Sequence, residues 1–355
     1  MLLAPSAGSP AALGFRMPAE WEPHAATWLS WPHKESSWPG KLDRIPPIWV
    51  EMVRHLASGE AVNVLVNDAA PALRVRALLD AAGVSLDRVH LREVPTDDAW
   101  MRDHGPTFVT RGDEFALIDW IYNAWGGKYP PWENDDRVPR ALAALLDAPR
   151  FAPGLVLEGG SIEVDGAGTL LTTEQCLLNP NRNPGRTRAE IEQALCDYLG
   201  ARRVLWLGDG ILGDDTDGHV DDLTRFVGPA TVVTVAEDDP ADPNHAPLED
   251  NLRRLGSMRD AADRPLRVVT LPMPTPVEYD GQRLPASYAN FYIGNAVVLV
   301  PVFGCPNDAR ALATLRELFP GRKVVGLDAT DLVWGLGAFH CVTQQQPAAT
   351  RPAQL

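Results

Sequence analysis

The segment from Asp214 to Asp222 places one histidine among five carboxylates. If His219 and Asp221 begin a strand, the two-residue period turns both side chains to one face, whereas on a helix they would diverge by about 200°. A His-x-Asp pair on a strand is a compact acid–base and cation-binding unit. A solvated acidic loop is one alternative. A metal site is the other, and it needs a further histidine or carboxylate ligand from elsewhere in the chain.

Cys341 follows His340 in the run GLGAFHCVTQ (335–344). Adjacent residues of a strand point to opposite faces, so His340 is not expected to activate Cys341. If Cys341 is a nucleophile, its histidine must come from another part of the chain, and His219 is the natural candidate. A buried inert cysteine is the alternative. That alternative is the expectation for the remaining cysteines, which are Cys176, Cys196 and Cys305.

Asp103 lies at a turn in WMRDHGP (100–106), just before an apolar strand. With Asp97 and Trp100 beside it, this segment can supply a carboxylate and an aromatic wall to a cation pocket. A local ion pair between Arg102 and Asp103 at the surface is the alternative interpretation.

Glu158 ends the apolar run LVL and precedes two glycines. An acidic residue at a strand end before two glycines often faces a cavity, because the backbone there is cramped. An ordinary turn fits the same residues.

Helical patterns alternate with short apolar runs, which predicts the α/β class. The helix over 186–200 has Thr187 and Glu190 in capping-box spacing and a stop at Gly200. Further helices are predicted over 71–83 and 308–319, and buried strands over 61–66, 232–236, 296–303 and 323–327.

A polar cluster that runs into a hairpin recurs along the chain, at intervals of roughly 50 to 80 residues. The hairpins are predicted over 102–118, 158–172, 218–235 and 289–303, with lone strands of the same kind over 24–32 and 339–344. A long period of this kind indicates radial repetition of a small α/β unit, with each polar cluster delivered to a common centre. A doubly wound sheet with several hairpins is the alternative.

The 355 residues are 45% hydrophobic and 22% charged, which excludes a disordered or fibrous chain. With 32 basic against 47 acidic residues the net charge is −15, which disfavours nucleic-acid binding. No apolar run reaches the length of a membrane span. The four cysteines show no CxxC spacing, which indicates a reducing, cytoplasmic compartment without structural zinc.

The chain shows no clear boundary between two domains. Residues 1–16 are expected to form a loose leader without the basic start of a signal peptide. A single catalytic domain is expected over 17–347, followed by a tail over 348–355.

Several long motifs stand in the same order as in a known family. They include MPAEWEPHAATWLSWP (17–32), DDAWMRDHGPTFV (97–109), LEGGSIEVDG (157–166), CLLNPNRNPGRT (176–187), DTDGHVDDLTRFV (215–227) and HCVTQQQP (340–347). On these motifs the chain resembles the agmatine deiminases and bacterial peptidylarginine deiminases of the guanidino-group-modifying superfamily. The resemblance implies a five-bladed α/β propeller with pseudo-fivefold symmetry, the pentein fold.

The resemblance also implies roles for matching residues. Cys341 would be the nucleophile and His219 the general acid and base. Asp103 and Asp221 would bind the guanidinium, and Glu158 would be the acid beside His219. No metal or organic cofactor is implied. Departures from the usual pattern, DTDGH and GLGAFH, lie next to these positions.

The implied partner is a small cationic guanidine, with agmatine and water giving N-carbamoylputrescine and ammonia. The acidic segments of Asp97, Asp215 and Asp217 suit the amine of agmatine better than the carboxylate of free arginine. Trp100 and Gly337 complete the expected substrate contacts. A deiminase of peptidyl-arginine or another guanidine is the alternative, and a non-catalytic propeller used as a binding module is a third hypothesis. No nucleic-acid or membrane partner is expected, and a homo-oligomer is left open.

Overall fold

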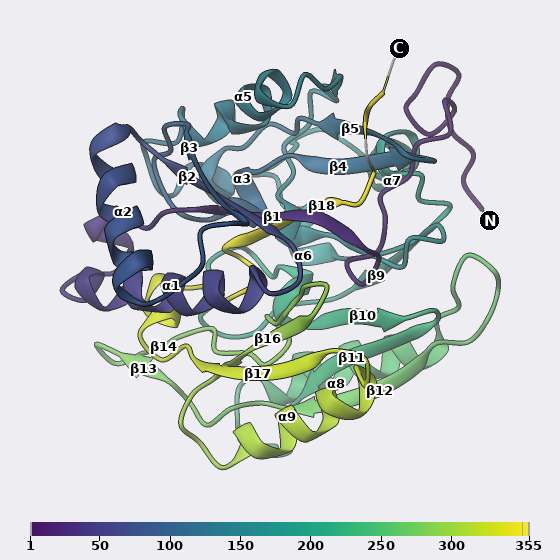
Figure 1. The fold of residues 1–355 in the computed structure, drawn as a ribbon. Coiled ribbons are helices and arrows are strands. Elements are labelled where there is room, and N and C mark those ends of the chain that lie inside the picture. Colours follow the sequence, from purple (N-terminus) through teal and green to yellow (C-terminus); the bar gives the residue numbers. More distant parts are fainter. Residues whose placement is uncertain (1, 350, 354–355) are drawn as a thin grey trace.

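Five sheets in the described part of the chain share one pairing pattern (Figure 1). The computed structural model describes residues 2–349 and 351–353. In each of these sheets, one strand pairs antiparallel with a second, and the second pairs parallel with a third. The predicted mixed α/β class is confirmed, and so are the four predicted hairpins.

The five sheets are built from strands that follow one another along the chain, except that the first and the second sheet each include a strand from the far end. They are β18 (Thr343–Pro347), β1 (His24–Ser30), β2 (Ala61–Val66) and β3 (Val89–Glu93); β4 (Thr107–Arg111), β5 (Glu114–Ile118) and β6 (Arg150–Phe151); β7 (Glu163–Val164), β8 (Thr169–Thr173) and β9 (Arg203–Leu207); β10 (Thr224–Gly228), β11 (Thr231–Ala236) and β12 (Arg267–Pro272); and β15 (Tyr292–Ile293), β16 (Val297–Val302) and β17 (Lys323–Asp328). A separate hairpin joins β13 (Glu278–Tyr279) to β14 (Gln282–Arg283).

The longer helices connect the parallel strands, and α1, α2, α5 and α9 lie around the outside of the molecule in Figure 1. They are α1 (Ile45–Leu56), α2 (Ala69–Ala81), α5 (Val138–Leu145), α7 (Arg188–Leu199), α8 (His245–Ser257) and α9 (Asn307–Leu318). The predicted capping box of α7 is confirmed, since the Thr187 side chain accepts from the Glu190 N–H, and Gly200 ends the helix with φ 73°. No described helix is long and apolar enough to cross a membrane.

A short turn or a single helical turn precedes the first strand of each antiparallel pair. These five segments are α3 (Met101–His104) before β4, the 3₁₀ turn η4 (Gly159–Ser161) before β7, the 3₁₀ turn η5 (Val220–Asp222) before β10, residues 287–290 before β15, and residues 339–342 before β18. Asp103, Asp221 and Cys341 lie on these segments, and Glu158 and His219 directly precede η4 and η5.

The five segments contact one another in a ring. Segments α3 and η4 are joined by the Gly160 N–H, which donates to Asp103 Oδ1 at 2.9 Å, and η4 in turn contacts η5. The remaining links are Ser287 Oγ to the Asp222 carbonyl at 2.7 Å, the His340 N–H to the Asn290 carbonyl at 3.1 Å, and the Arg102 N–H to the Cys341 carbonyl at 3.1 Å. One polar segment of each sheet therefore reaches a shared centre.

Two predicted strands are corrected at this centre. His219 and Asp221 do not start a strand, because η5 intervenes and β10 begins only at Thr224. The strand predicted over 339–344 begins at Thr343, because the Thr343 hydroxyl and N–H donate back to the carbonyls of Phe339 and His340 and close a turn.

The segment before residue 17 is packed against the rest of the chain, contrary to the expected loose leader. Phe15 is buried against Phe151, and Arg16 bridges to Thr110 of β4. In the tail, β19 (Arg351–Pro352) adds to β5, while residues 350 and 354–355 lie outside the described residues. Both ends thus add backbone pairing to the second sheet.

Candidate active site

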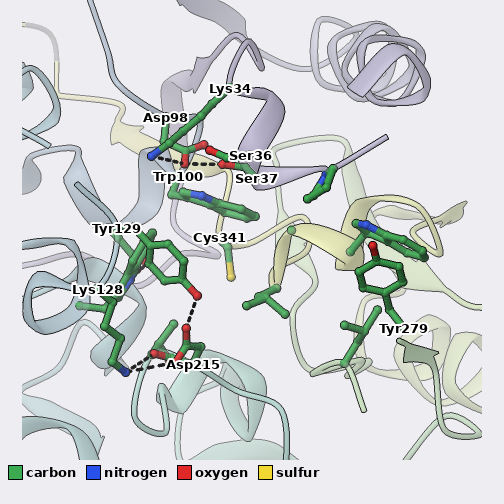
Figure 2. Close-up of a pocket in the computed structure, with 18 of the residues that line it drawn as sticks. Lys34, Ser36, Ser37, Asp98, Trp100, Lys128, Tyr129, Asp215, Tyr279 and Cys341 are labelled. Carbon is green, nitrogen blue, oxygen red and sulfur yellow. Dashed lines mark hydrogen bonds and ion pairs between the residues drawn. The ribbon is translucent and has the colours of Figure 1, made fainter. Parts of the chain in front are cut away.

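Cys341 lies at the floor of a cavity of about 460 Å³. In Figure 2 its sulfur points into the space between Tyr129 and Asp215 on one side and Tyr279 on the other. Asp103 shares the floor, and Trp100 and Trp125 form the inner wall. The mouth combines aromatic rings with acids and lysines, which are Lys34, Asp98, Lys128, Tyr129, Asp215, Tyr279 and Trp334.

Asp103 is held on the cavity floor by two neutral donors. The Gly160 N–H donates to Oδ1 at 2.9 Å, and the Trp125 indole N–H donates to Oδ2 at 2.9 Å. Burial raises the pKa of Asp103 to about 6, with Asp221 and nearby carboxylates adding to the shift and His219 opposing it. Both hydrogen bonds thus come from neutral groups, and the imidazole of His219 lies 3.8 Å from Oδ1.

Asp221 divides its two oxygens between two environments. Oδ2 lies 2.6 Å from His340 Nδ1, while buried Oδ1 has no hydrogen-bond partner in the part of the chain that the structure describes. Burial alone would raise the pKa of Asp221, but the hydrogen bond and charge of His340 hold it below the ordinary value. An ionised, unpartnered carboxylate oxygen in a buried site is a ready acceptor for a cationic N–H group.

His219 is fully buried, and neither ring nitrogen has a hydrogen-bond partner among the described residues. Nδ1 lies 3.8 Å from Asp103 Oδ1, and Nε2 lies 3.8 Å from Glu158 Oε2. Burial alone would lower the pKa of His219, but the carboxylate of Asp103 and its other neighbours raise it well above the ordinary value. The imidazole is therefore a charged proton donor with both nitrogens free.

Glu158 is fully buried beside His219. Arg182 Nε donates to Oε1 at 2.7 Å, and Oε2 has no partner. Burial would raise the pKa of Glu158, but His219 and Arg182 hold it below the ordinary value. Arg182 continues to Asp217, whose Oδ2 accepts from Nη1 at 2.6 Å.

The Cys341 thiol sits in an electronegative environment. Its sulfur lies 3.8 Å from Asp221 Oδ2 and accepts from Asn290 Nδ2 at 3.0 Å. Burial raises the pKa of the thiol well above its ordinary value, and the carboxylates of Asp221 and Asp103 raise it further. In the free protein the group is therefore a neutral thiol, and a bound cation would favour its thiolate.

The residues predicted for chemistry, Cys341, His219, Glu158, Asp103 and Asp221, come together at this site. A Cβ at Gly160 would lie 2.5 Å from His219 Nδ1, 2.8 Å from Asp103 Oδ1 and 3.0 Å from Asp221 Oδ2. Only a glycine leaves room for these three side chains to converge.

The predicted substrate contacts divide into two groups. Trp100 and Asp215 line the cavity, and Gly337 packs between the Trp100 ring and Cys341, where a Cβ would lie 2.5 Å from the ring. Asp97 and Asp217 do not line it. Asp97 accepts from the backbone and side chain of Asn134, both at 2.8 Å, and Asp217 is held by Arg182, Asn181 and Lys128.

Residues that the sequence did not point to also shape the site. Asn290, Arg182, Trp125 and His340 bond directly to predicted site residues, and Lys34, Lys128, Tyr129, Tyr279 and Trp334 line the mouth. The expectation that His340 and Cys341 point away from each other is wrong, because they lie in a turn and both approach Asp221.

One group within the described residues has metal-ligand character. A ligand atom of Glu158, of Cys176 and of His219 all lie within 4.8 Å of one another, and all three residues are buried. If His219 bound a metal ion, the further ligands would therefore be Glu158 and Cys176, and Asp221 would not be one of them. A cation held there would occupy the free nitrogen of His219 and so compete with proton transfer by it.

Known proteins match this chain over nearly its whole length. A family model for Porphyromonas-type peptidyl-arginine deiminase matches residues 16–347. Agmatine deiminases from Ectopseudomonas mendocina (strain ymp) and Pseudomonas aeruginosa (strain LESB58) are 42% and 41% identical, each covering 96% of this chain and 97% of the relative.

Solved structures agree with these relatives. Agmatine deiminase of Enterococcus faecalis superposes with a TM-score of 0.89 at 35% identity, covering 98% of this chain and all of that one. A substrate-bound C. jejuni agmatine deiminase superposes with a TM-score of 0.86 at 28% identity, covering 96% and 97% of the two chains.

Proposed function

Because this chain belongs to the Porphyromonas-type peptidyl-arginine deiminase family, we propose that it hydrolyses the guanidinium group of agmatine. The products are N-carbamoylputrescine and ammonia. The enzyme is an amidine hydrolase that works through a covalent intermediate on Cys341.

The observation that carries the proposal is the placement of one thiol near two carboxylates: Asp103 lines the cavity together with Cys341, and the buried Asp221 carboxylate lies 3.8 Å from the sulfur. Asp103 and Asp221 come from the segments before β4 and β10, and Cys341 comes from the segment before β18. A guanidinium is a planar cation with N–H groups at its edges, so two carboxylates fix both its charge and its plane. Its electron-poor carbon is then oriented toward the sulfur.

The first step begins when substrate enters. The cation offsets the carboxylates that keep Cys341 protonated, so the thiol proton leaves to solvent and the thiolate remains. The sulfur attacks the guanidinium carbon and forms a C–S bond, and the carbon becomes tetrahedral. Asp103 and Asp221 hold the remaining N–H groups through this change.

His219 carries the proton steps. As an imidazolium it donates its proton to the departing nitrogen, the C–N bond breaks, and ammonia leaves behind an S-alkylthiouronium. The neutral imidazole then takes a proton from water, whose oxygen attacks the same carbon. The C–S bond breaks, the ureido product leaves, and the Cys341 thiol is regenerated. Glu158 keeps His219 charged and oriented, and Arg182 in turn fixes Glu158.

The mouth favours an amine at the far end of the substrate. Lys34 is paired with Asp98 at 3.5 Å and Lys128 with Asp215 at 3.3 Å, so neither lysine offers an uncompensated charge to the carboxylate of free arginine. Aromatic rings, including Tyr129 and Trp334, line the same region and stabilise cations through their faces. This combination supports agmatine.

A substrate panel tests the proposal. Ammonia release is measured with the purified protein and agmatine, free arginine, an arginine-containing peptide and other guanidines. We expect agmatine to give the highest kcat/KM. Preference for the peptide would establish the peptidyl-arginine alternative, and release from none of the compounds would favour a non-catalytic binding module.

We also propose a five-bladed α/β propeller, a single catalytic domain over 17–347 and a cytoplasmic location. The shared pairing pattern of five sheets and the ring of contacts among their leading segments support the propeller. The cysteine pattern supports the location.

A further inference from the structure

We propose that His340 is a positioning residue for the reaction. As a buried imidazolium, it holds the Asp221 carboxylate in place and adds a positive charge near Cys341. The inference deepens the proposed function, on which its kinetic part rests. It assigns to His340 a task distinct from that of His219.

Both ring nitrogens of His340 face carboxylate oxygens. Nδ1 lies 2.6 Å from Asp221 Oδ2, and Nε2 lies 2.8 Å from Glu20 Oε2. The ring is buried, so no water replaces either partner. A neutral imidazole has one donor nitrogen and one acceptor nitrogen, whereas a carboxylate only accepts. Two ionised carboxylates therefore require both nitrogens to donate, which only the imidazolium does.

Two cations besides His340, Arg102 and Arg225, favour the ionised form of Glu20. The pKa of Asp221 is below its ordinary value, as described above. Burial would raise the pKa of Glu20, but Arg225 and His340 hold it well below the ordinary value. Glu20 accepts from Arg102 Nη2 at 3.1 Å and forms an ion pair with Arg225 Nη2 at 2.8 Å.

The other charged groups around His340 belong to the same network. Arg225 also binds Glu163, at 2.8 Å, and Arg102 Nε donates to the carbonyl of His340 at 3.4 Å. Asp222 follows Asp221, burial together with Asp221 raises its pKa well above the ordinary value, and its Oδ1 accepts from Asn290 Nδ2 at 2.9 Å. The close contact with the Asp221 carboxylate, at 2.6 Å, is therefore made by His340 and not by one of these groups.

Two consequences for catalysis follow. With Oδ2 bound to His340, Asp221 cannot rotate freely, and Oδ1 stays unpartnered and available to the substrate. The positive ring also lies next to the one carboxylate oxygen that is 3.8 Å from the Cys341 sulfur, so it offsets part of the repulsion that this oxygen exerts on a thiolate. His219, with no partner on either nitrogen, is free for proton transfer.

Two substitutions separate the parts of this role. The amide nitrogen of His340→Asn falls near Nδ1 and can still donate to Asp221, whereas that of His340→Gln falls near Nε2 and faces Glu20. Both remove the charge. We expect kcat/KM for agmatine to fall at least 10-fold in His340→Gln and less in His340→Asn. In both variants, iodoacetamide should alkylate Cys341 more slowly at a fixed pH, with a higher alkylation midpoint.

His104→Asn is the matched control, because His104 is also buried but its Nε2 faces the Ser30 hydroxyl at 3.4 Å and forms no ion pair with a described carboxylate. It should leave the alkylation of Cys341, followed by peptide mass spectrometry, unchanged. An unmoved alkylation rate in both His340 variants would overturn the proposal. So would failure of both to fold while His104→Asn folds, because His340 would then be a structural residue. The alkylation needs no turnover, so it decides this inference even if agmatine is not the substrate.

Discussion

The sulfur of Cys341 lies 3.8 Å from the Oδ2 atom of Asp221, and both residues are buried. An anion beside a second anion in such a place is costly, so the free protein keeps the cysteine as a thiol. A bound guanidinium removes that cost. The arrangement thus makes the nucleophile depend on the substrate's own charge.

Asp103→Asn and Asp221→Asn should each weaken transition-state binding by about 2 to 5 kcal/mol, as when one member of a buried charged pair is removed. The loss should appear in kcat/KM for agmatine. Because each substitution removes a negative charge near Cys341, the alkylation midpoint of the free enzyme should fall. This is opposite in sign to the effect of substituting His340.

Asp113→Asn, in an exposed turn between β4 and β5, is the control for these variants. It should change neither kcat/KM nor the alkylation midpoint. Near-normal kcat/KM and an unmoved midpoint in both site variants would remove Asp103 and Asp221 from the guanidinium site.

The acid limb of the pH profile should report Asp103. The folded-state pKa of about 6 means that the carboxylate becomes protonated as pH falls below that value, and a neutral acid no longer holds the cation. We expect kcat/KM to decline below about pH 6. The same profile measured on Asp103→Asn should lack this limb, and an unchanged limb would assign it to another group.

His219→Ala should lower kcat by about 10² to 10⁴-fold, because both ammonia departure and water attack lose their proton carrier. Steady-state rates with agmatine and a melting curve are the measurements. Turnover within tenfold of wild type in a folded variant would assign proton transfer to another residue.

Chelation should leave activity and melting temperature unchanged, since the proposed steps are assigned to Cys341 and His219. The measurement is ammonia release before and after dialysis against EDTA. Loss of activity that one divalent ion restores would instead give the cluster of Glu158, Cys176 and His219 a metal-binding role.

Local patterns were sufficient to predict only part of the regular elements, among them α2, α7 and α9 but not α5 or α8. The capping box at Thr187, the glycine stop at Gly200 and the apolar run of β16 are all confirmed. Helix α1 was not predicted, because Pro46 and Pro47 interrupt the pattern there, although prolines are well tolerated in the first turn of a helix.

The strand predicted at His219 failed for a local reason. The carboxylate of Asp214 accepts from the N–H groups of Thr216 and His219, and Asp217 and Gly218 adopt left-handed backbone angles. These contacts fold the acidic segment into a turn. Asp214 therefore shapes the backbone, Asp215 pairs with Lys128, and Asp217 binds Arg182 and Lys128. The segment thus offers fewer free carboxylates to a substrate than its composition suggested.

The supporting residues of the site depend on contacts between distant segments. Asn290 reaches Cys341 from 51 residues away, and Arg182 reaches Glu158 from a loop before α7. Neither residue carries a short-range signal, because an asparagine in a turn and an arginine in a polar loop are common. The family motifs place them in the correct order, but only the fold shows what they touch.

The central claim is that Cys341 attacks the guanidinium carbon. Rapid mixing with agmatine, an acid quench and peptide mass spectrometry test it directly. We predict that the peptide containing Cys341 gains the mass of agmatine less one ammonia, that Cys341→Ser shows no adduct and almost no turnover, and that Cys305→Ser behaves as wild type. Full ammonia release from Cys341→Ser, or an adduct on another residue, would contradict covalent catalysis by Cys341.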